Sequence, residues 1–218
     1  SEAYLQIRNY MQEVPSLFIY NCICVMSDQL VSKAGTITSG DDRFMEWKTK
    51  DGNKETTALA DFTTFFEGIF QKERLLDIIK NFICFNNEGL KSYKILAGYH
   101  QYFAVRKAIV RTEQAVQGDG KIGVFWHTQG SGKSLSMVFY AHLLQSTIES
   151  PTIVVITDRN DLDNQLYTQF ANCKDFLRQV PQQAESREHL KSLLNGRKAN
   201  GIIFTTMQKF EESNEPLS

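Results

Sequence analysis

Apolar and polar residues follow one another irregularly over about the first 90 residues of the chain. At residues 3–13 the apolar side chains recur at helical spacing, and this helix is expected to end before Pro15, because the residue preceding a proline is disfavoured in helical conformation. The dense apolar run at residues 17–25 predicts a buried strand. Two short strands are predicted at residues 31–38 and 44–48, around a turn at 39–42, and an exposed loop is predicted at 48–55. Two helices are predicted within 58–82, with a break near 68–71, and a second turn is predicted at 86–89.

Beyond about residue 90 the pattern changes to strands that alternate with helices. The predicted order is helix 99–114, turn 118–120, strand 121–126, helix 132–145, strand 152–157, helix 161–170, helix 187–194 and strand 201–205. Such alternation implies a parallel sheet with helices on both faces. We therefore expect an α/β chain with a boundary within residues 85–98, divided into 1–88 and 89–218.

The composition is that of an ordinary folded protein. Of 218 residues, 42% are apolar and 22% are charged, which suits one or two domains with a substantial core. The formal net charge of -1 is uninformative about nucleic acid, because a local groove of Lys and Arg suffices to hold phosphates. The chain has neither a signal-peptide pattern nor an apolar run near the ~18 residues of a membrane span, so a cytoplasmic protein without a membrane partner is expected.

The four cysteines form no CxxC pair, and no histidine lies at zinc-ligand spacing from them. We expect them to be reduced, small buried residues without a structural metal. They are Cys22, Cys24, Cys84 and Cys173. Because the chain begins abruptly at Ser1 without an initiator Met, a fragment of a longer protein is expected.

The chemistry of the chain is concentrated in one glycine-rich turn. An apolar strand at 122–126, the sequence HTQGSGKS and a helical pattern follow one another in the order of a P-loop. Gly130 and Gly132 let the backbone turn tightly with its N–H groups inward, and the following helix adds its positive dipole end. Lys133 supplies a charge to the β- and γ-phosphates, and Ser134 offers a hydroxyl ligand to Mg²⁺. The predicted ATP-binding residues, here called the phosphate loop, are Thr128, Gln129, Gly130, Ser131, Gly132, Lys133 and Ser134.

This signal is specific. A GxGK[S/T] string arises by chance in about one chain of this length in two hundred, and the strand before it and helix after it make chance rarer. His127 stands where the strict GxxxxGK[S/T] pattern has its first glycine, a departure that many helicase-like motors share. The alternative is a glycine turn that merely opens an ordinary helix.

Three ordered segments resemble the motor (R) subunit of type I restriction enzymes: the phosphate loop in its setting at 123–134, TDRNDLDNQL at 157–166, and FTTMQKF at 204–210. Three further segments, 15–21, 27–28 and 44–48, are more weakly similar to the region that connects the nuclease to the motor in this family. The resemblance implies a superfamily 2 DNA translocase. The resemblance also implies the fold: a RecA-like P-loop parallel sheet with flanking helices, preceded by the C-terminal part of a PD-(D/E)xK-type nuclease α/β domain.

The resemblance also implies roles for residues outside the phosphate loop. Gln101 matches the adenine-reading glutamine, whose amide can both donate and accept, although the residue alone would suggest a surface position on a helix. Gln6 and Tyr10 look like the QxxxY motif of some nucleases, although a plain amphipathic helix explains them equally well. The candidates for DNA contacts are Arg159, Thr206, Gln208 and Lys209, with a simple helix N-terminus as the alternative around Arg159.

The implied cofactors are ATP and Mg²⁺, the latter held by Ser134 through the nucleotide. The implied partners are double-stranded DNA and the methyltransferase and specificity subunits. No Asp…Glu-x-Lys set lies ahead of the first helix, and no acidic box follows a strand after Thr206. The fragment alone is therefore expected to leave DNA uncut, to bind ATP weakly and to hydrolyse it negligibly.

Two other functions remain open at this point. Asp158, at the end of the apolar strand 152–157, could hold Mg²⁺ in a small P-loop phosphotransferase. A nucleotide-gated scaffold that docks to partner subunits is the non-enzymatic alternative.

Overall fold

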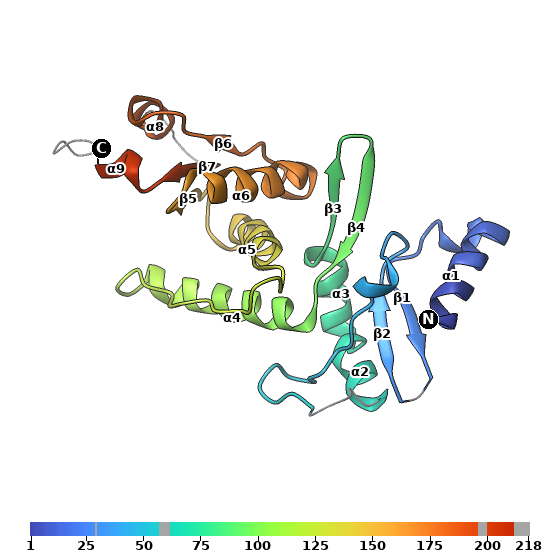
Figure 1. Cartoon of the computed structure of the whole chain (residues 1–218). Coiled ribbons are helices and arrows are strands. Elements are labelled where there is room, and N and C mark those ends of the chain that lie inside the picture. The colour runs from blue at the N-terminus through green and yellow to red at the C-terminus, as the bar shows by residue number, and fades with distance from the viewer. Residues whose placement is uncertain (29, 57–61, 196–199, 212–218) are drawn as a thin grey trace. The chain divides into compact units, whose positions relative to one another are not determined.

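The computed structural model of the chain describes residues 1–28, 30–56, 62–195 and 200–211 (Figure 1). By its internal contacts the chain separates into two units, Ser1–Lys107 and Ala108–Ser218. The separation falls within helix α4 (Tyr99–Val116), and the boundary expected near residue 88 stays a prediction.

The N-terminal segment confirms one prediction and corrects the next. Helix α1 (Glu2–Glu13) is present, but the strand predicted at 17–25 is wrong over most of its length. Pro15 opens a 3-10 turn, η1 (Pro15–Phe18), because its fixed φ suits the first position of a helical turn. Tyr20 is 94% exposed, and the extended chain becomes strand β1 only at Cys24–Ser27.

Strand β1 pairs antiparallel with β2 (Ser32–Gly35). The strand predicted at 44–48 is wrong, since only Met45 pairs there, through a single bridge to Ala34. A Cβ atom on Gly35 would lie 2.9 Å from the Phe44 ring, so glycine is required for the buried ring to approach the sheet. The turn predicted at 39–42 contains the 3-10 turn η2 (Asp41–Arg43).

Helices α2 (Phe62–Ile69) and α3 (Lys72–Asn81) confirm the predicted helix pair and its break, although residues 58–61 lie outside the described residues. A β-hairpin follows, formed by β3 (Ile83–Glu88) and β4 (Lys91–Leu96). The turn predicted at 86–89 is therefore misplaced. Asparagine is rare in strands, yet the backbone of residues 86–88 pairs with β4, and the turn begins at Gly89 with φ of 60°.

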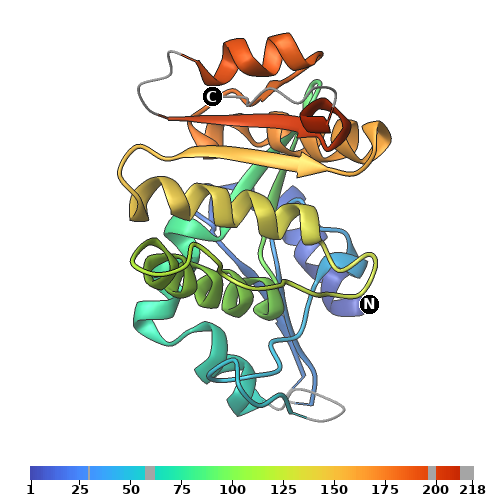
Figure 2. The same ribbon diagram turned by 90° about the vertical axis from the view of Figure 1, so that its left-hand side faces the viewer.

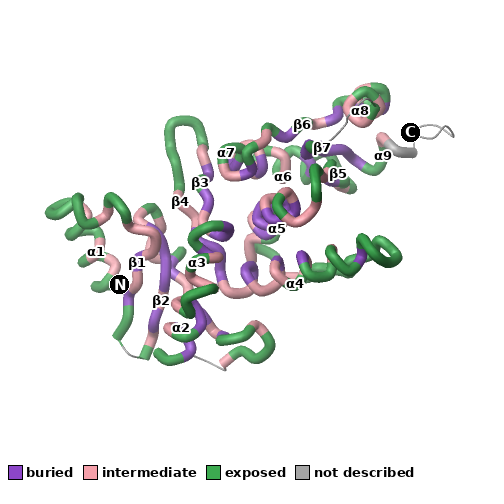
Figure 3. Tube along the Cα trace, turned by 180° about the vertical axis from the view of Figure 1, so that it is seen from behind, coloured by how far each residue is buried: buried purple, intermediate pink, exposed green. Residues whose placement is uncertain are grey.

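The second unit contains a parallel sheet in the order β5-β7-β6. Strands β5 (Thr152–Thr157) and β7 (Gly201–Thr206) confirm the predictions, whereas the short β6 (Gln182–Gln183) was not predicted. All six residues of the central β7 are buried, as the burial colouring of Figure 3 shows.

Helices α5 (Lys133–Thr147), α6 (Asn160–Asn172) and α8 (Arg187–Leu194) lie where they were predicted. The short α7 (Lys174–Leu177) was not predicted, and the short α9 (Gln208–Glu211) follows β7. Figure 2 shows α6 behind the side-by-side strands β5 and β7. On the other face of β5, Val154 and Ile156 are 37% and 52% exposed. The expectation that helices cover both faces is therefore wrong for β5 in the described part of the chain.

The strand predicted at 121–126 is the clearest error in this unit. Those residues form no strand pairing with any described residue, and Val124 and Trp126 are 96% and 78% exposed. A strand is stabilised by hydrogen bonds to a neighbouring strand, so an apolar run without such a neighbour stays irregular. No helix in the described ranges is long and apolar enough to cross a membrane.

Candidate nucleotide-binding site

The phosphate loop leads directly into α5, and its two glycines adopt conformations that other residues rarely adopt. Gly130 and Gly132 have φ of 81° and 80°, in the left-handed region that is open to a residue without Cβ. Gly132 is the N-cap residue of α5 and has no side chain that could accept hydrogen bonds from the first helical turn. The helix therefore starts with a positive end that a phosphate can approach.

The side chain of Lys133 lies across the phosphate loop. Its Nζ donates to the carbonyl oxygens of His127, at 2.8 Å, and Thr128, at 2.9 Å. The Thr128 carbonyl also accepts from the Ser131 hydroxyl at 2.8 Å. The ammonium group is thus held beside the helix N-terminus, where its charge and the helix dipole would act on the same anion.

The remaining loop residues are accessible. Thr128, Gln129 and Ser134 are exposed, and Ser131 is half-buried. Ser134 directly follows Lys133 in the first turn of α5, so its hydroxyl is open to a metal ion carried by a nucleotide. Oxygen ligands of this kind suit Mg²⁺, which usually binds through few protein groups together with substrate phosphates.

Helix α5 anchors the phosphate loop firmly. Val138 and Phe139 are fully buried, and α5 packs against α6 and α7. The Tyr140 hydroxyl hydrogen-bonds the Thr112 hydroxyl at 2.6 Å, and the His142 ring stacks on Phe176 with ring centroids 4.1 Å apart. A loop at the start of such a helix is held on a rigid element, as recognition of a phosphate group requires.

The conformation of Gly130 gives a first prediction. No heavy atom lies within 4 Å of a Cβ atom built on Gly130, so Gly130→Ala changes only the backbone preference. Because φ is 81°, alanine is expected to destabilise this loop by about 1–2 kcal/mol. The expected result is weaker ATP binding in calorimetry with little change in the melting temperature of the chain. A matched Gly120→Ala variant, also at positive φ with open space around the Cβ, should leave ATP binding unchanged.

The candidate DNA-contacting residues gather near the carboxyl ends of β5 and β7, the edge at which α/β sheets bind ligands. Arg159 is 77% exposed and pairs loosely with Asp158 at 3.7 Å. The Gln208 amide donates to the Asp158 carbonyl at 2.9 Å, which joins the two loops. Lys209 donates to the Ala184 carbonyl, and Thr206 is buried. Arg159 and Gln208 are thus accessible, whereas the side chain of Thr206 is not.

Sequence reasoning missed the buried carboxylate that organises this edge. Asp163 is 1% exposed and accepts from the Thr157 hydroxyl at 3.1 Å and from the Gln183 amide at 2.6 Å. The Gln183 amide also donates to Asn164 at 2.9 Å. Asp163 therefore ties the start of α6 to the end of β5 and to β6. The signals for it were an acidic residue on the apolar side of the predicted helix and its place within the family-like segment 157–166.

The other predicted residues lie in the first unit. Gln101 is buried rather than on the helix surface, and its Oε1 accepts from the Gly98 amide at 2.9 Å at the start of α4. Gln6 and Tyr10 are both exposed, one turn apart on α1. The structure shows no ligand-directed arrangement around this pair within the described residues.

The cysteines are free thiols, and three of them, Cys24, Cys84 and Cys173, are buried as small apolar residues. Burial raises the pKa of the Cys24 thiol, with a smaller opposing effect from Lys94. A raised thiol pKa disfavours the reactive thiolate.

A parallel sheet with helices, one of which starts at a glycine-rich loop, is the architecture of α/β ATPases. Residues 100–218, more than half of the chain, match the family described as SWI2/SNF2 ATPase. The chain belongs to this family.

Relatives also match the chain over nearly its whole length. It is 42% identical, over 99% of its length, to the type I restriction enzyme HindI endonuclease subunit of Haemophilus influenzae, of which it covers 22%. It is 33% identical, over 96% of its length, to the putative MjaIXP endonuclease subunit of Methanocaldococcus jannaschii, of which it covers 21%. The predicted resemblance to the type I restriction subunits is confirmed, and the chain spans about a fifth of the length of these relatives.

Proposed function

We propose that the chain is the nucleotide-binding part of an ATP-dependent DNA translocase in a type I restriction system, with the triphosphate held by the phosphate loop. The observation that carries this proposal is the position of the Lys133 ammonium beside two left-handed glycines at the start of α5. ATP is the expected nucleotide, with Mg²⁺ bound through its phosphates and the Ser134 hydroxyl. Gln101 is proposed to read the adenine edge, since its amide both donates and accepts.

In the whole subunit, residues 1–88 are proposed to complete a PD-(D/E)xK-type nuclease domain and residues 89–218 to begin the motor. Gln6 and Tyr10 would then belong to the nuclease part. Double-stranded DNA and the methyltransferase and specificity subunits are the proposed partners. The names of the relatives support this assignment, since each is an endonuclease subunit of a type I restriction enzyme.

The exposed apolar residues of the second unit support a larger sheet in the whole subunit. Strand β5 pairs with β7 but with no other described strand, and Val124 and Trp126 are exposed on an unpaired segment. We infer that a further strand, ending in the acidic box that would hold Mg²⁺, pairs at the open edge of β5. Such pairing would satisfy backbone groups that are otherwise left at an edge.

The test of the proposed function is ATP hydrolysis by the whole subunit with and without linear double-stranded DNA. Hydrolysis that increases when DNA is added is expected. Equal rates with and without DNA would contradict a translocase, and transfer of the γ-phosphate to a small acceptor, abolished by Asp158→Asn, would favour a phosphotransferase instead.

Arg159 provides a further prediction. Because its side chain is 77% exposed next to Gln208, we expect it to contact a DNA phosphate. Arg159→Ala in the whole subunit should weaken DNA binding similarly for all sequences and reduce the slope of log K against log salt by about 1. Arg178→Ala, at the C-terminal end of α7, is the matched control and should leave the slope unchanged. An unaltered slope for Arg159→Ala would exclude the contact.

A further inference from the structure

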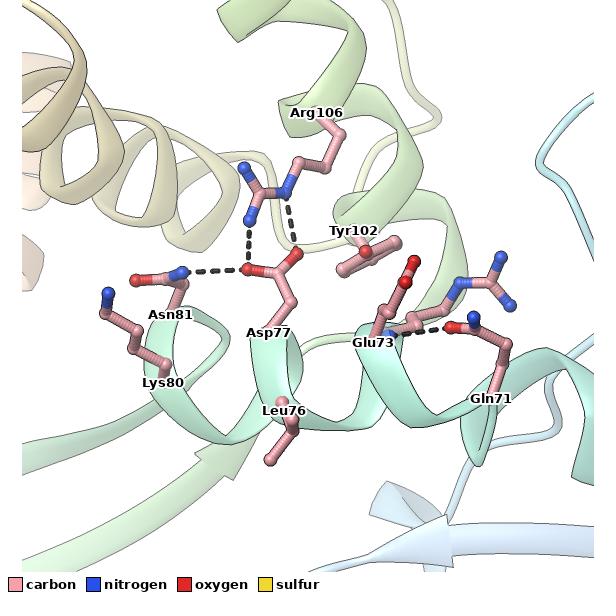
Figure 4. Close-up of a pocket in the computed structure, with 9 residues that line it drawn as sticks. Gln71, Glu73, Leu76, Asp77, Lys80, Asn81, Tyr102 and Arg106 are labelled. Atoms are coloured by element: carbon pink, nitrogen blue, oxygen red, sulfur yellow. Dashed lines mark hydrogen bonds and ion pairs between the residues drawn. The ribbon is translucent and has the colours of Figure 1, made fainter.

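Asp77 of α3 accepts hydrogen bonds from side chains of both α3 and α4. Its carboxylate accepts from Arg106 Nε at 2.7 Å and from Arg106 Nη2, and also from the Asn81 amide at 2.7 Å. The Tyr102 hydroxyl is a further donor, since its hydrogen bond to Asp77 contributes to the raised pKa of the phenol. Figure 4 shows Asp77 pointing from α3 toward Arg106 and Asn81, with the Tyr102 ring beside it.

Two of these donor residues, Tyr102 and Arg106, belong to α4 and lie four positions apart on one face of the helix. A bidentate contact to Arg106 and a hydrogen bond to Tyr102 fix both the rotation of α4 about its axis and its position along that axis. The side chains of Asp77 and Arg106 are 14% and 36% exposed, so the ion pair is partly shielded from water and stronger than a fully exposed surface pair. Burial, followed by the contact with Asp77, raises the pKa of Tyr102 to about 12.

A second set of contacts also connects α3 to α4. The Arg74 guanidinium lies 5.1 Å from the ring centroid of Phe103 and 6.0 Å from that of Tyr102. The same side chain donates to the Glu67 and Gly68 carbonyls at the end of α2. Residues of α3 and α4, together with Gln71, line an open pocket of about 710 Å³, and Asp77 is one of them.

Gln101 immediately precedes Tyr102 on α4. Adjacent helical residues differ by about 100° in direction, so the rotation that places Tyr102 against Asp77 also sets the direction of the Gln101 side chain. Gln101 is 4% exposed, and its Oε1 accepts from the Gly98 amide. A small rotation of α4 would therefore disturb the orientation of a side chain that has little room to adjust.

We propose that Asp77 is a positioning residue for nucleobase recognition: from α3 it fixes α4 in the rotation and axial position that set the orientation of the Gln101 amide. This inference rests on the proposed function, in which Gln101 reads the base. Adenine presents an amino donor next to a ring acceptor, whereas hypoxanthine presents an oxygen acceptor in place of that donor. An amide held in one orientation distinguishes the two bases, and an amide free to turn over does not.

The test compares ATP with inosine triphosphate as substrates of the whole subunit. In Asp77→Asn, which keeps the size of the side chain and removes its charge, KM for ATP is expected to rise at least about fivefold. KM for inosine triphosphate should change less than about twofold, because the phosphate contacts are unaffected. Arg106→Gln, which breaks the same contact from α4, should reproduce this change, and the double variant should add little to it.

Three controls separate positioning from general destabilisation. Gln101→Ala should remove the preference for ATP directly. Asp77→Glu should restore part of the preference, since the charge is kept. Met26→Ala, in the buried cluster of Cys24, Met26 and Phe44, should lower the melting temperature without altering the preference.

The outcomes are distinguishable. If Gln101→Ala removes the preference while folded Asp77→Asn and Arg106→Gln retain it, the positioning role of Asp77 is wrong and adenine reading by Gln101 stands. If Gln101→Ala also retains the preference, adenine reading itself is wrong, and the positioning role fails with it. If Met26→Ala lost the preference for ATP to the same extent, the effect of Asp77→Asn would reflect general destabilisation, and the inference would be overturned.

Discussion

Lys133→Ala is expected to weaken the binding of Mg·ATP at least about tenfold, because a charge-assisted contact to phosphate contributes roughly 1.5–3 kcal/mol. The ammonium group already lies beside the helix N-terminus, held by the His127 and Thr128 carbonyls, so this side chain is ordered before phosphate arrives. Calorimetric titration of the chain measures the change directly. In the whole subunit the same variant should abolish ATP hydrolysis.

The control for Lys133 is Lys174→Ala, which removes an exposed lysine at the start of α7. It changes the net charge equally but leaves the phosphate loop intact, so ATP affinity should stay within about twofold of the original. If Lys133→Ala and Lys174→Ala bound ATP equally well, Lys133 would have no place in the site.

Phe204→Ala should have the largest effect on stability in the second unit. Phe204 is fully buried in the central strand β7, with its ring centroid 5.0 Å from that of Phe170 and 5.7 Å from that of Tyr167. Deleting a buried phenylalanine side chain lowers the free energy of unfolding by about 3–5 kcal/mol, because apolar burial is lost and a cavity remains. Thermal and urea unfolding of the chain measure this loss.

The matched control is Ile156→Ala on the open face of β5, where the side chain is 52% exposed. Its expected loss is below about 1 kcal/mol, since little apolar surface is buried there. Comparable losses of unfolding free energy in Phe204→Ala and Ile156→Ala would contradict the burial pattern of the sheet.

Elements with local signals could be predicted from the sequence. Strand β5 contains a run of β-branched residues, and α8 is capped by Ser186, whose hydroxyl accepts from the His189 amide at 3.1 Å. The glycine turn before α5 was predictable for the same reason. The conformations of Gly130 and Gly132 and the start of α5 depend on residues that are close together in the chain.

Features that depend on distant partners could not be predicted. Residues 17–25 and 121–126 are both apolar runs, but an apolar run becomes a strand only where another strand pairs with it. The contact between Asp77 and Arg106 spans 29 positions, and that between Asp163 and Gln183 spans 20. In each case the sequence shows a charged or polar residue on a helix, and only the fold brings its partner to it.

The central claim, that the phosphate loop holds the triphosphate, is tested most directly by following the backbone amide signals of the chain by NMR while Mg·ATP is added. The largest shifts are expected at residues 130–134, with much smaller shifts on addition of AMP, which lacks the β- and γ-phosphates. Shifts that cluster elsewhere while residues 130–134 stay unchanged would contradict the claim.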